Sequence, residues 1–158
     1  MNEQQEQFLI KYLDTVNPQH KNFLPNVIVD FFCADEINAN ICADLILKGE
    51  KTATCSLKYW YESGQEPMPE VGNLQIVTDW NGKPTSIIRT LKVTECAFNE
   101  VTEEFAVLEG EGDKTLDWWR KVHWDFFSKE CFELGIQATP NMILVLEQFE
   151  LVYKAGCQ

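Results

Sequence analysis

The Asn81-Gly82 pair constrains the fold of this chain more than any other feature of its sequence. Asn-Gly is favoured in tight β-hairpin turns because both residues tolerate a positive φ there. Alternating apolar and polar residues flank the pair, over 74–79 and over 87–98. This pattern predicts two antiparallel strands joined by the turn, and it excludes an all-helical chain.

Helical patterns occupy much of the remaining sequence, at 3–14, 35–48, 100–107 and 115–134. In the second of these segments Asp35 can cap the start, and Gly49 stands where a helix C-terminal glycine belongs. Its apolar residues Ile37, Ile41 and Leu45 recur every fourth residue. We therefore expect a helix that runs to about Lys48.

The apolar run Met142–Leu146 predicts a buried strand that continues to about Tyr153. Strands and helices thus mix without the regular alternation of parallel-sheet proteins. We predict an α+β fold with a curved or closed sheet. With 158 residues, 45% of them hydrophobic, the chain is expected to form a single domain with its own core.

The chain is acidic, with 25 Asp and Glu residues, 13 Lys and Arg residues and a formal net charge of −12. Non-specific nucleic-acid binding depends on neutralising phosphates with Lys and Arg, so we expect no non-specific binding to DNA. Anionic membranes should also repel the chain. A small ligand, or a nucleic acid held at one local basic spot, fits this charge better. The basic residues that could form such a spot are Lys48, Lys51, Lys58, Arg120 and Lys121.

Targeting and cofactor signals are missing from the sequence. Residues 1–6 lack the basic and apolar regions of a signal peptide, and no run approaches the roughly 18 apolar residues of a membrane span. Six scattered cysteines without a Cys-x-x-Cys pair favour free thiols in a reducing cytoplasm. The two histidines, His20 and His123, are far apart, and no zinc-type spacing is visible. We predict a cytoplasmic protein with neither a metal ion nor another cofactor.

A polar segment follows the second helix, and it contains Lys51 and Thr54. We expect a loop in which both side chains face one pocket. A threonine hydroxyl becomes a nucleophile only when a base takes its proton. Lys51 is that base if its pKa falls from about 10.4 to about 7, which requires roughly 4.6 kcal/mol. A neighbouring carboxylate would instead keep Lys51 charged, so that the lysine holds an oxyanion or phosphate and the carboxylate is the base. Cys55 is an alternative nucleophile.

Three further features are open to two interpretations each. The run Glu109-Gly110-Glu111-Gly112-Asp113 either carries a carboxylate into a site or is an exposed turn whose Asp113 or Thr115 caps the next helix. The aromatic run Tyr59-Trp60-Tyr61 either stacks on a base or packs into the domain as part of a strand. His123 is either a site residue or a partly buried histidine of the long helix.

Several of these motifs together resemble the ASCH family (activating signal cointegrator homology) of the PUA-like superfamily. The segment from Gly49 to Thr54 resembles the family's Gly-x-Lys-x-x-Thr loop. The Glu-Gly-Glu-Gly-Asp run resembles a largely uncharacterised bacterial subgroup. The other matching residues are Val71-Gly72-Asn73, Ile87-Ile88-Arg89-Thr90, Phe105-Ala106, Leu116, Trp119-Arg120 and His123. The resemblance covers about residues 35–153.

The resemblance implies a small β-barrel flanked by helices, in a single domain over 1–158 with an N-terminal helical extension at about 1–34. It implies binding of RNA, a nucleotide or a modified nucleoside in a cleft beside the Gly-x-Lys loop. Two alternatives are a metal-independent amidohydrolase, acting on an acylated nucleoside such as N(4)-acetylcytidine, and a ribonuclease.

The resemblance also assigns roles to individual residues. In the amidohydrolase, Thr54 would be the nucleophile, Lys51 the base or oxyanion holder, and Glu109 the proton-carrying or orienting acid. The expected substrate-binding residues are Lys58, Trp60, Glu111, Arg120 and His123. The chain departs from the family at Ser56, where many members carry an arginine that can hold a phosphate or carboxylate in a bidentate manner. Lys58, Arg89 and Arg120 are the cations that could replace it.

Overall fold

The computed structural model describes residues 1–16 and 27–156 of the chain. Within these residues a five-stranded sheet forms the centre of the molecule, in the order β1-β3-β4-β5-β2. Its strands are β1 (Ile28–Asp30), β2 (Ala53–Leu57), β3 (Leu74–Thr78), β4 (Pro84–Ala97) and β5 (Ile143–Lys154). The β1–β3 pair is parallel and the other pairs are antiparallel. The sheet is curled into a half-barrel, so the predicted α+β class with a PUA-like fold is confirmed.

The predicted hairpin is the β3–β4 pair, but its connection is longer than a two-residue turn. Thr78 pairs with Pro84, which leaves residues 79–83 in the loop. The Asp79 carboxylate accepts hydrogen bonds from the backbone N–H groups of Asn81 and Lys83, at 3.0 and 2.9 Å. Gly82 has φ of 80°, but Asn81 is not among the described non-glycine residues with a positive φ, so the two-residue turn of the Asn-Gly signal does not form. The side chain of Asp79 therefore stabilises a wider loop than the dipeptide alone predicts.

The long β4–β5 ladder gives the sheet its curvature. The two strands pair from Ser86–Lys154 to Ala97–Ile143, with register shifts at Ile87/Ile88 and at Thr90/Lys92. Such irregularities bend a strand and increase its local twist. The two ends of the ladder therefore face different helices.

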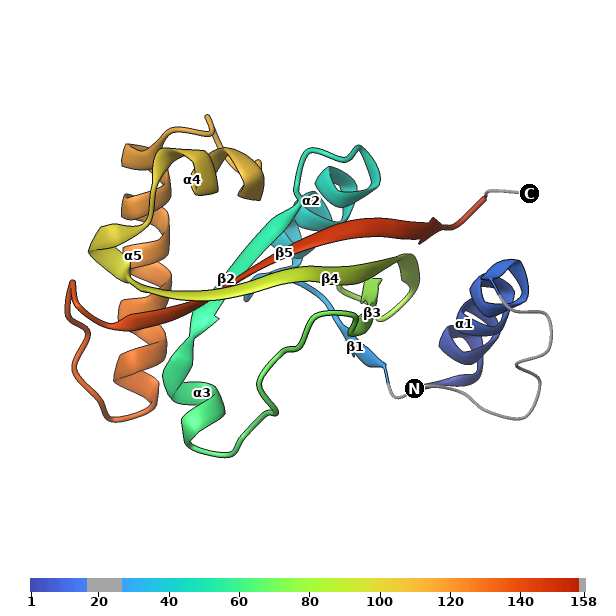
Figure 1. The fold of residues 1–158 in the computed structure, drawn as a ribbon, viewed down its shortest axis with the longest axis horizontal. Coiled ribbons are helices and arrows are strands. Elements are labelled where there is room, and N and C mark those ends of the chain that lie inside the picture. The colour runs from blue at the N-terminus through green and yellow to red at the C-terminus, as the bar shows by residue number, and fades with distance from the viewer. Residues whose placement is uncertain (17–26, 157–158) are drawn as a thin grey trace.

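Five α-helices and one short 3-10 helix surround the sheet in the described part of the chain (Figure 1). They are α1 (Glu3–Val16), α2 (Glu36–Leu47), α3 (Lys58–Glu62), η1 (Phe98–Glu100), α4 (Glu103–Glu109) and α5 (Leu116–Glu133). In Figure 1, α1 lies at one end of the molecule, and α4 and α5 lie at the other. Asp35 and Thr115 cap α2 and α5, as their positions predict.

Each helix group covers its own part of the core. The helix α1 packs on Ile76 and Ile87, and α2 packs on Val77, Ile88 and Phe149. The largest cluster lies at the α4–α5 end, where buried residues of α4 and α5 pack against both ends of β2 and the start of β5. This cluster supports the polar cavity described below.

The buried side of α2 is formed mainly by small residues rather than by the isoleucines that recur in its sequence. Ile37 and Ile41 are exposed, whereas the buried residues of the helix are Ala39, Cys42, Ala43 and Ile46. Three of these four side chains are small, so the helix can approach the sheet closely. The recurrence of large apolar residues therefore indicated the helix but not its buried side.

Three local predictions were wrong in type. The segment after Lys51 is not a loop throughout, because Ala53–Leu57 forms β2 and pairs with residues 144–148 of β5. The Tyr59–Tyr61 run lies in the short helix α3 rather than in a strand. Residues 28–30 form β1, so the predicted N-terminal extension is not wholly helical. Asn17-Pro18, His20 and Cys157 lie outside the described residues.

Candidate functional site

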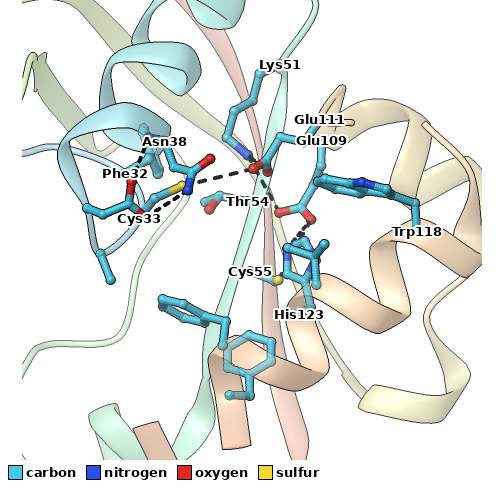
Figure 2. Close-up of a pocket in the computed structure, with 15 residues that line it drawn as sticks. Phe32, Cys33, Asn38, Lys51, Thr54, Cys55, Glu109, Glu111, Trp118 and His123 are labelled. Atoms are coloured by element: carbon cyan, nitrogen blue, oxygen red, sulfur yellow. Dashed lines mark hydrogen bonds and ion pairs between the residues drawn. The ribbon is translucent and has the colours of Figure 1, made fainter. Parts of the chain in front are cut away.

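A cavity of about 330 Å³ lies beside the first residues of β2, and it contains the most strongly buried charges of the described chain. Four parts of the fold form its walls: the β1–α2 loop with the first turn of α2, the Lys51–Cys55 segment, the Glu109–Glu111 turn and one side of α5. Figure 2 shows the Lys51 side chain extending toward the two glutamates, with Thr54 beside them and Cys33 on the opposite wall. These four parts are far apart in the sequence, and the folding of the chain around the sheet makes them neighbours.

Lys51 is almost fully buried, with 2% of its surface exposed. Its Nζ lies 2.8 Å from Oε2 of Glu111 and 3.7 Å from Oε1 of Glu109, and 5.6 Å from the ring centre of Phe32. Burial alone lowers the pKa of Lys51, but the two carboxylates outweigh it and raise the pKa above its ordinary value. Lys51 is therefore a charged ammonium, which fits the holder of an oxyanion better than a general base.

Glu109 is the last residue of α4 and is 1% exposed. Its Oε2 accepts a hydrogen bond from Nε1 of Trp119 and lies 3.0 Å from Nε2 of His123. Burial raises the pKa of Glu109. Lys51, His123 and Trp119 lower it by more, so the pKa lies below its ordinary value. The carboxylate is therefore ionised although no water reaches most of it.

His123 is the fourth member of the charge cluster formed with Lys51, Glu109 and Glu111, and it lies one turn after Trp119 on α5. Its Nδ1 lies 2.9 Å from the backbone oxygen of Trp119, and its Nε2 faces the Glu109 carboxylate. Both ring nitrogens face acceptors, so both carry a proton when these contacts are satisfied. Burial lowers the pKa of His123, but Glu109 and Glu111 raise it overall. The ring also stacks on Trp119, with centroids 4.2 Å apart. The site thus holds two cations against two carboxylates.

The acidic run turns both glutamates inward, so the two interpretations of this run are each partly correct. Gly110 has φ of 69°, and a Cβ there would lie 2.1 Å from the backbone oxygen of Glu50. The run therefore packs directly on the segment that carries Lys51. Thr115 meanwhile caps α5 by accepting from the N–H of Trp118, and Asp113 accepts from Thr115.

The predicted site residues fall into two groups. Lys51, Thr54, Glu109, Glu111 and His123 line the cavity. The remaining three lie outside its lining and have other partners: Lys58 pairs with Glu62 and Glu95, Trp60 donates to Glu130, and Arg120 donates to the backbone oxygen of Asn99.

Ser56 stands where many family members carry an arginine, and it does not supply a cation to the cavity. The Ser56 hydroxyl lies 2.7 Å from the Tyr61 hydroxyl. Arg89, another potential replacement, pairs with Glu150 and is not part of the cavity lining. Lys51 and His123 are therefore the cations that the described residues bring to the cavity.

Several lining residues were missed by the sequence analysis. They include Phe32, Cys33 and Asn38 from the start of α2 and the loop before it, and Trp118 and Phe126 from α5. The loop residues lack a recognisable motif, and the two aromatic residues read as ordinary core positions of a helix. Only the approach of α2 and α5 to the edge of the sheet makes them neighbours.

A second cavity of about 520 Å³ adjoins the first and shares Phe32, Cys33, Thr54, Cys55 and Phe126 with it. Its lining includes four acids and no Lys, Arg or His among the described residues. These acids are Asp30, Glu66, Glu130 and Glu147, from four separate parts of the chain. Burial raises the pKa of Asp30 and of Glu147. Among the described residues, the basic side chains of the combined cavity, Lys51 and His123, therefore lie in its first part, together with Glu109 and Glu111.

Glu130 makes this second cavity sensitive to pH. Burial raises its pKa from 4.5 to about 7, against the opposing effect of a hydrogen bond from Trp60. The folded state thus holds this proton more tightly than the unfolded state, so stability falls as pH rises from 4.5 to about 7. In Glu130→Gln, which keeps an acceptor for Trp60, this loss is absent.

We therefore expect Glu130→Gln and the original chain to be similarly stable near pH 5, and the variant to be more stable near pH 8. Denaturant unfolding at both pH values measures the difference, and Glu133→Gln on the same helix is the control. A stability difference that does not change with pH would contradict the assignment.

Among the residues that the structure describes, two groups of side chains have donor atoms close enough to hold a metal ion: Cys33 with Cys42 and Glu111, and Cys55 with Glu109 and His123. In the second group Glu109 already binds Lys51, Trp119 and His123, which leaves little for a metal ion. Burial also raises the pKa of Cys55, whose Sγ lies 4.0 Å from Oε2 of Glu109, so its thiol is protonated and a poor nucleophile.

The sequence model of the ASCH domain family matches residues 28–153 of the chain. The chain belongs to the ASCH domain family. An ASCH domain of known structure from Lactobacillus crispatus JV V101 is 53% identical, with a TM-score of 0.91, and the match covers 97% of this chain and 96% of that one. A protein from Enterococcus faecalis V583 is 32% identical, with a TM-score of 0.82, over 94% of this chain and 90% of that one. No curated protein matches the chain.

Family membership supports, in general terms, an RNA-binding or hydrolase-type domain. None of the helices in the described part of the chain is long and apolar enough to cross a membrane.

Proposed function

We propose that this ASCH protein is a metal-independent amidohydrolase that removes an acyl group from a small nucleoside-like molecule such as N(4)-acetylcytidine. The observation that carries the proposal is the buried, charged Lys51 between Glu109 and Glu111, in a cavity that Thr54 also lines. Buried charges of this kind are costly, and they cluster at functional sites.

The proposed reaction uses Lys51 as an ammonium and Glu109 as a carboxylate, as the directions of their pKa shifts indicate. The Thr54 hydroxyl attacks the carbonyl carbon of the amide and passes its proton to the Glu109 carboxylate. The Lys51 ammonium stabilises the negative oxygen that forms, as a preorganised cation does in a site shielded from water. The amine leaves with the proton from Glu109, and water then releases the acyl group from Thr54. His123 and Trp119 hold Glu109 in place throughout.

The size and charge of the cavity favour a single nucleoside over an RNA chain. A volume of about 330 Å³ is at the lower end of small-molecule sites, and Phe32, Trp118 and Phe126 supply aromatic surface for a base. The adjoining cavity is lined by four acids, which would repel a phosphate backbone. A neutral acylated nucleoside avoids this repulsion, which argues against long RNA as a ligand and against ribonuclease activity.

Thr54→Ala should abolish turnover of N(4)-acetylcytidine without unfolding the chain, since Thr54 is only partly buried on the edge strand β2. Loss of a nucleophile is expected to lower kcat by more than about 1,000-fold. Thr54→Ser keeps a hydroxyl and should retain measurable activity. Chromatography of the products from a panel of acylated nucleosides provides the measurement.

Full activity of Thr54→Ala would remove the nucleophile role. Absence of turnover in the original chain, together with a rise in its melting temperature on adding a nucleotide, would instead identify a binding module. Binding that weakens steeply with salt would indicate phosphate recognition and would contradict the preference for a neutral nucleoside.

A further inference from the structure

Two cysteines lie in contact on the cavity wall opposite Glu109. The Sγ atoms of Cys33 and Cys42 are 3.1 Å apart, although both residues are free cysteines. Cys42 is buried on α2, whereas Cys33 is partly exposed in the β1–α2 loop and lines both cavities. A disulfide bond is about 2.05 Å long, so the two sulfur atoms need to approach by only about 1 Å to form one.

The backbone at Cys33 supports a special role for this residue. Its φ is 72°, in the left-handed region, and Lys114 is the one other described non-glycine residue with a positive φ. Such conformations are uncommon for non-glycine residues and persist where the surroundings impose them. Here the conformation places the Cys33 sulfur against Cys42 and at the surface of the cavity.

Glu111 connects the two thiols with the charge cluster. Its Oε1 lies 3.5 Å from Sγ of Cys42 and 4.0 Å from Sγ of Cys33, while its Oε2 binds Lys51 at 2.8 Å. The carboxylate is therefore placed to accept a thiol proton during a reaction. The hydrogen bond with Cys33 and burial raise the pKa of Cys42, so the more accessible Cys33 is the thiol that an oxidant meets first.

We propose that Cys33 and Cys42 are a site of reversible oxidative modification, at which hydrogen peroxide or a similar small peroxide forms a disulfide bond. The Cys33 thiolate attacks one peroxide oxygen, the O–O bond breaks, and the hydroxide that leaves takes up a proton as water. The Cys42 sulfur then attacks the resulting sulfenic acid at the sulfur of Cys33, and Glu111 accepts the Cys42 proton. The hydroxide released takes up this proton. Two thiols and one peroxide thus give one disulfide and two waters.

The disulfide would change the site through Glu111. It removes both thiol groups as hydrogen-bond donors near Oε1, so Lys51 becomes the main partner of this carboxylate. Lys51 is then held more firmly by Glu111 and is less available to a substrate carbonyl. We expect oxidation to lower turnover several-fold and a dithiol reductant to restore it. This effect on turnover rests on the proposed amidohydrolase function, whereas formation of the disulfide does not.

Peptide mapping by mass spectrometry tests the disulfide on the full chain after brief treatment with hydrogen peroxide. The expected result is a Cys33–Cys42 linked peptide that disappears after reduction. Cys33→Ala should leave Cys42 reduced, and Cys131→Ala, which changes a buried cysteine of α5 elsewhere in the core, should still form the link. Circular dichroism of each sample confirms that the chain remains folded.

Two results would overturn the proposal. One is a folded chain in which Cys33 and Cys42 both remain reduced, or in which Cys33 is oxidised to sulfinic acid without linking to Cys42. The other is linkage of Cys33 to Cys55, Cys96 or Cys131 as often as to Cys42. If the disulfide forms but turnover by an active enzyme is unaffected, only the coupling through Glu111 is wrong. If no substrate is turned over at all, the mapping result still stands.

Discussion

Lys51→Met is expected to abolish turnover and to destabilise the chain strongly. The substitution keeps most of the side-chain length but leaves Glu109 and Glu111 without the ammonium that neutralises them. Removing one partner from a buried charge group typically costs about 3–5 kcal/mol, because the remaining charge is left unpaired. Loss of an oxyanion-stabilising group lowers kcat by roughly 100- to 1,000-fold. Denaturant unfolding and product assays measure the two effects.

Two variants separate the role of Lys51 from a general effect of lost charge. Lys58→Met removes a partly exposed lysine that pairs with Glu62 and Glu95, and it should change stability by no more than about 1 kcal/mol. Adding Glu111→Gln to Lys51→Met should recover part of the lost stability, because one unpaired carboxylate disappears. Equal losses of stability in Lys51→Met and Lys58→Met would show that the buried ion pairs of Lys51 stabilise the chain no more than the partly exposed pairs of Lys58.

Gly110→Ala is expected to have the second large effect, through the backbone rather than through charge. An alanine Cβ would lie 2.1 Å from the backbone oxygen of Glu50, and φ of 69° is itself unfavourable for alanine. The left-handed conformation costs about 1–2 kcal/mol, and overpacking adds about 1–3 kcal/mol. Relief of the clash must also separate the acidic run from the Lys51 segment. We therefore expect lower stability together with lower activity.

Gly135→Ala provides a closely matched control. Gly135 follows the end of α5 with φ of 71°, and a Cβ there meets nothing within 4 Å. The Gly135→Ala variant should lose only about 1–2 kcal/mol of stability, from the left-handed backbone conformation, and should keep full activity. Equal losses of stability in the two alanine variants would contradict a steric clash between the Cβ at position 110 and the backbone of Glu50. Thermal unfolding and the same product assay decide between these outcomes.

Much of the fold followed from local patterns in the sequence. The Asn81-Gly82 turn, the capping residues Asp35 and Thr115, and the apolar C-terminal strand depend on neighbours within a few residues, so their signals survive without tertiary information. The edge strand β2 did not follow, because its partner β5 is about 90 residues away in sequence. The buried side of α2 did not follow either, since small residues rather than the recurring isoleucines form most of it.

The candidate site divides in the same way. Motif order alone brought Lys51, Thr54, Glu109, Glu111 and His123 into consideration, and all five line one cavity. Their charge states could not follow from the sequence, because the pKa of Lys51 depends on burial and on the positions of two carboxylates. The second cavity with its four acids, and the contact between Cys33 and Cys42, likewise arise from distant segments. The sequence by itself determined which residues are available and which local elements form. The tertiary structure decided distances and burial, and these set the electrostatics on which function depends.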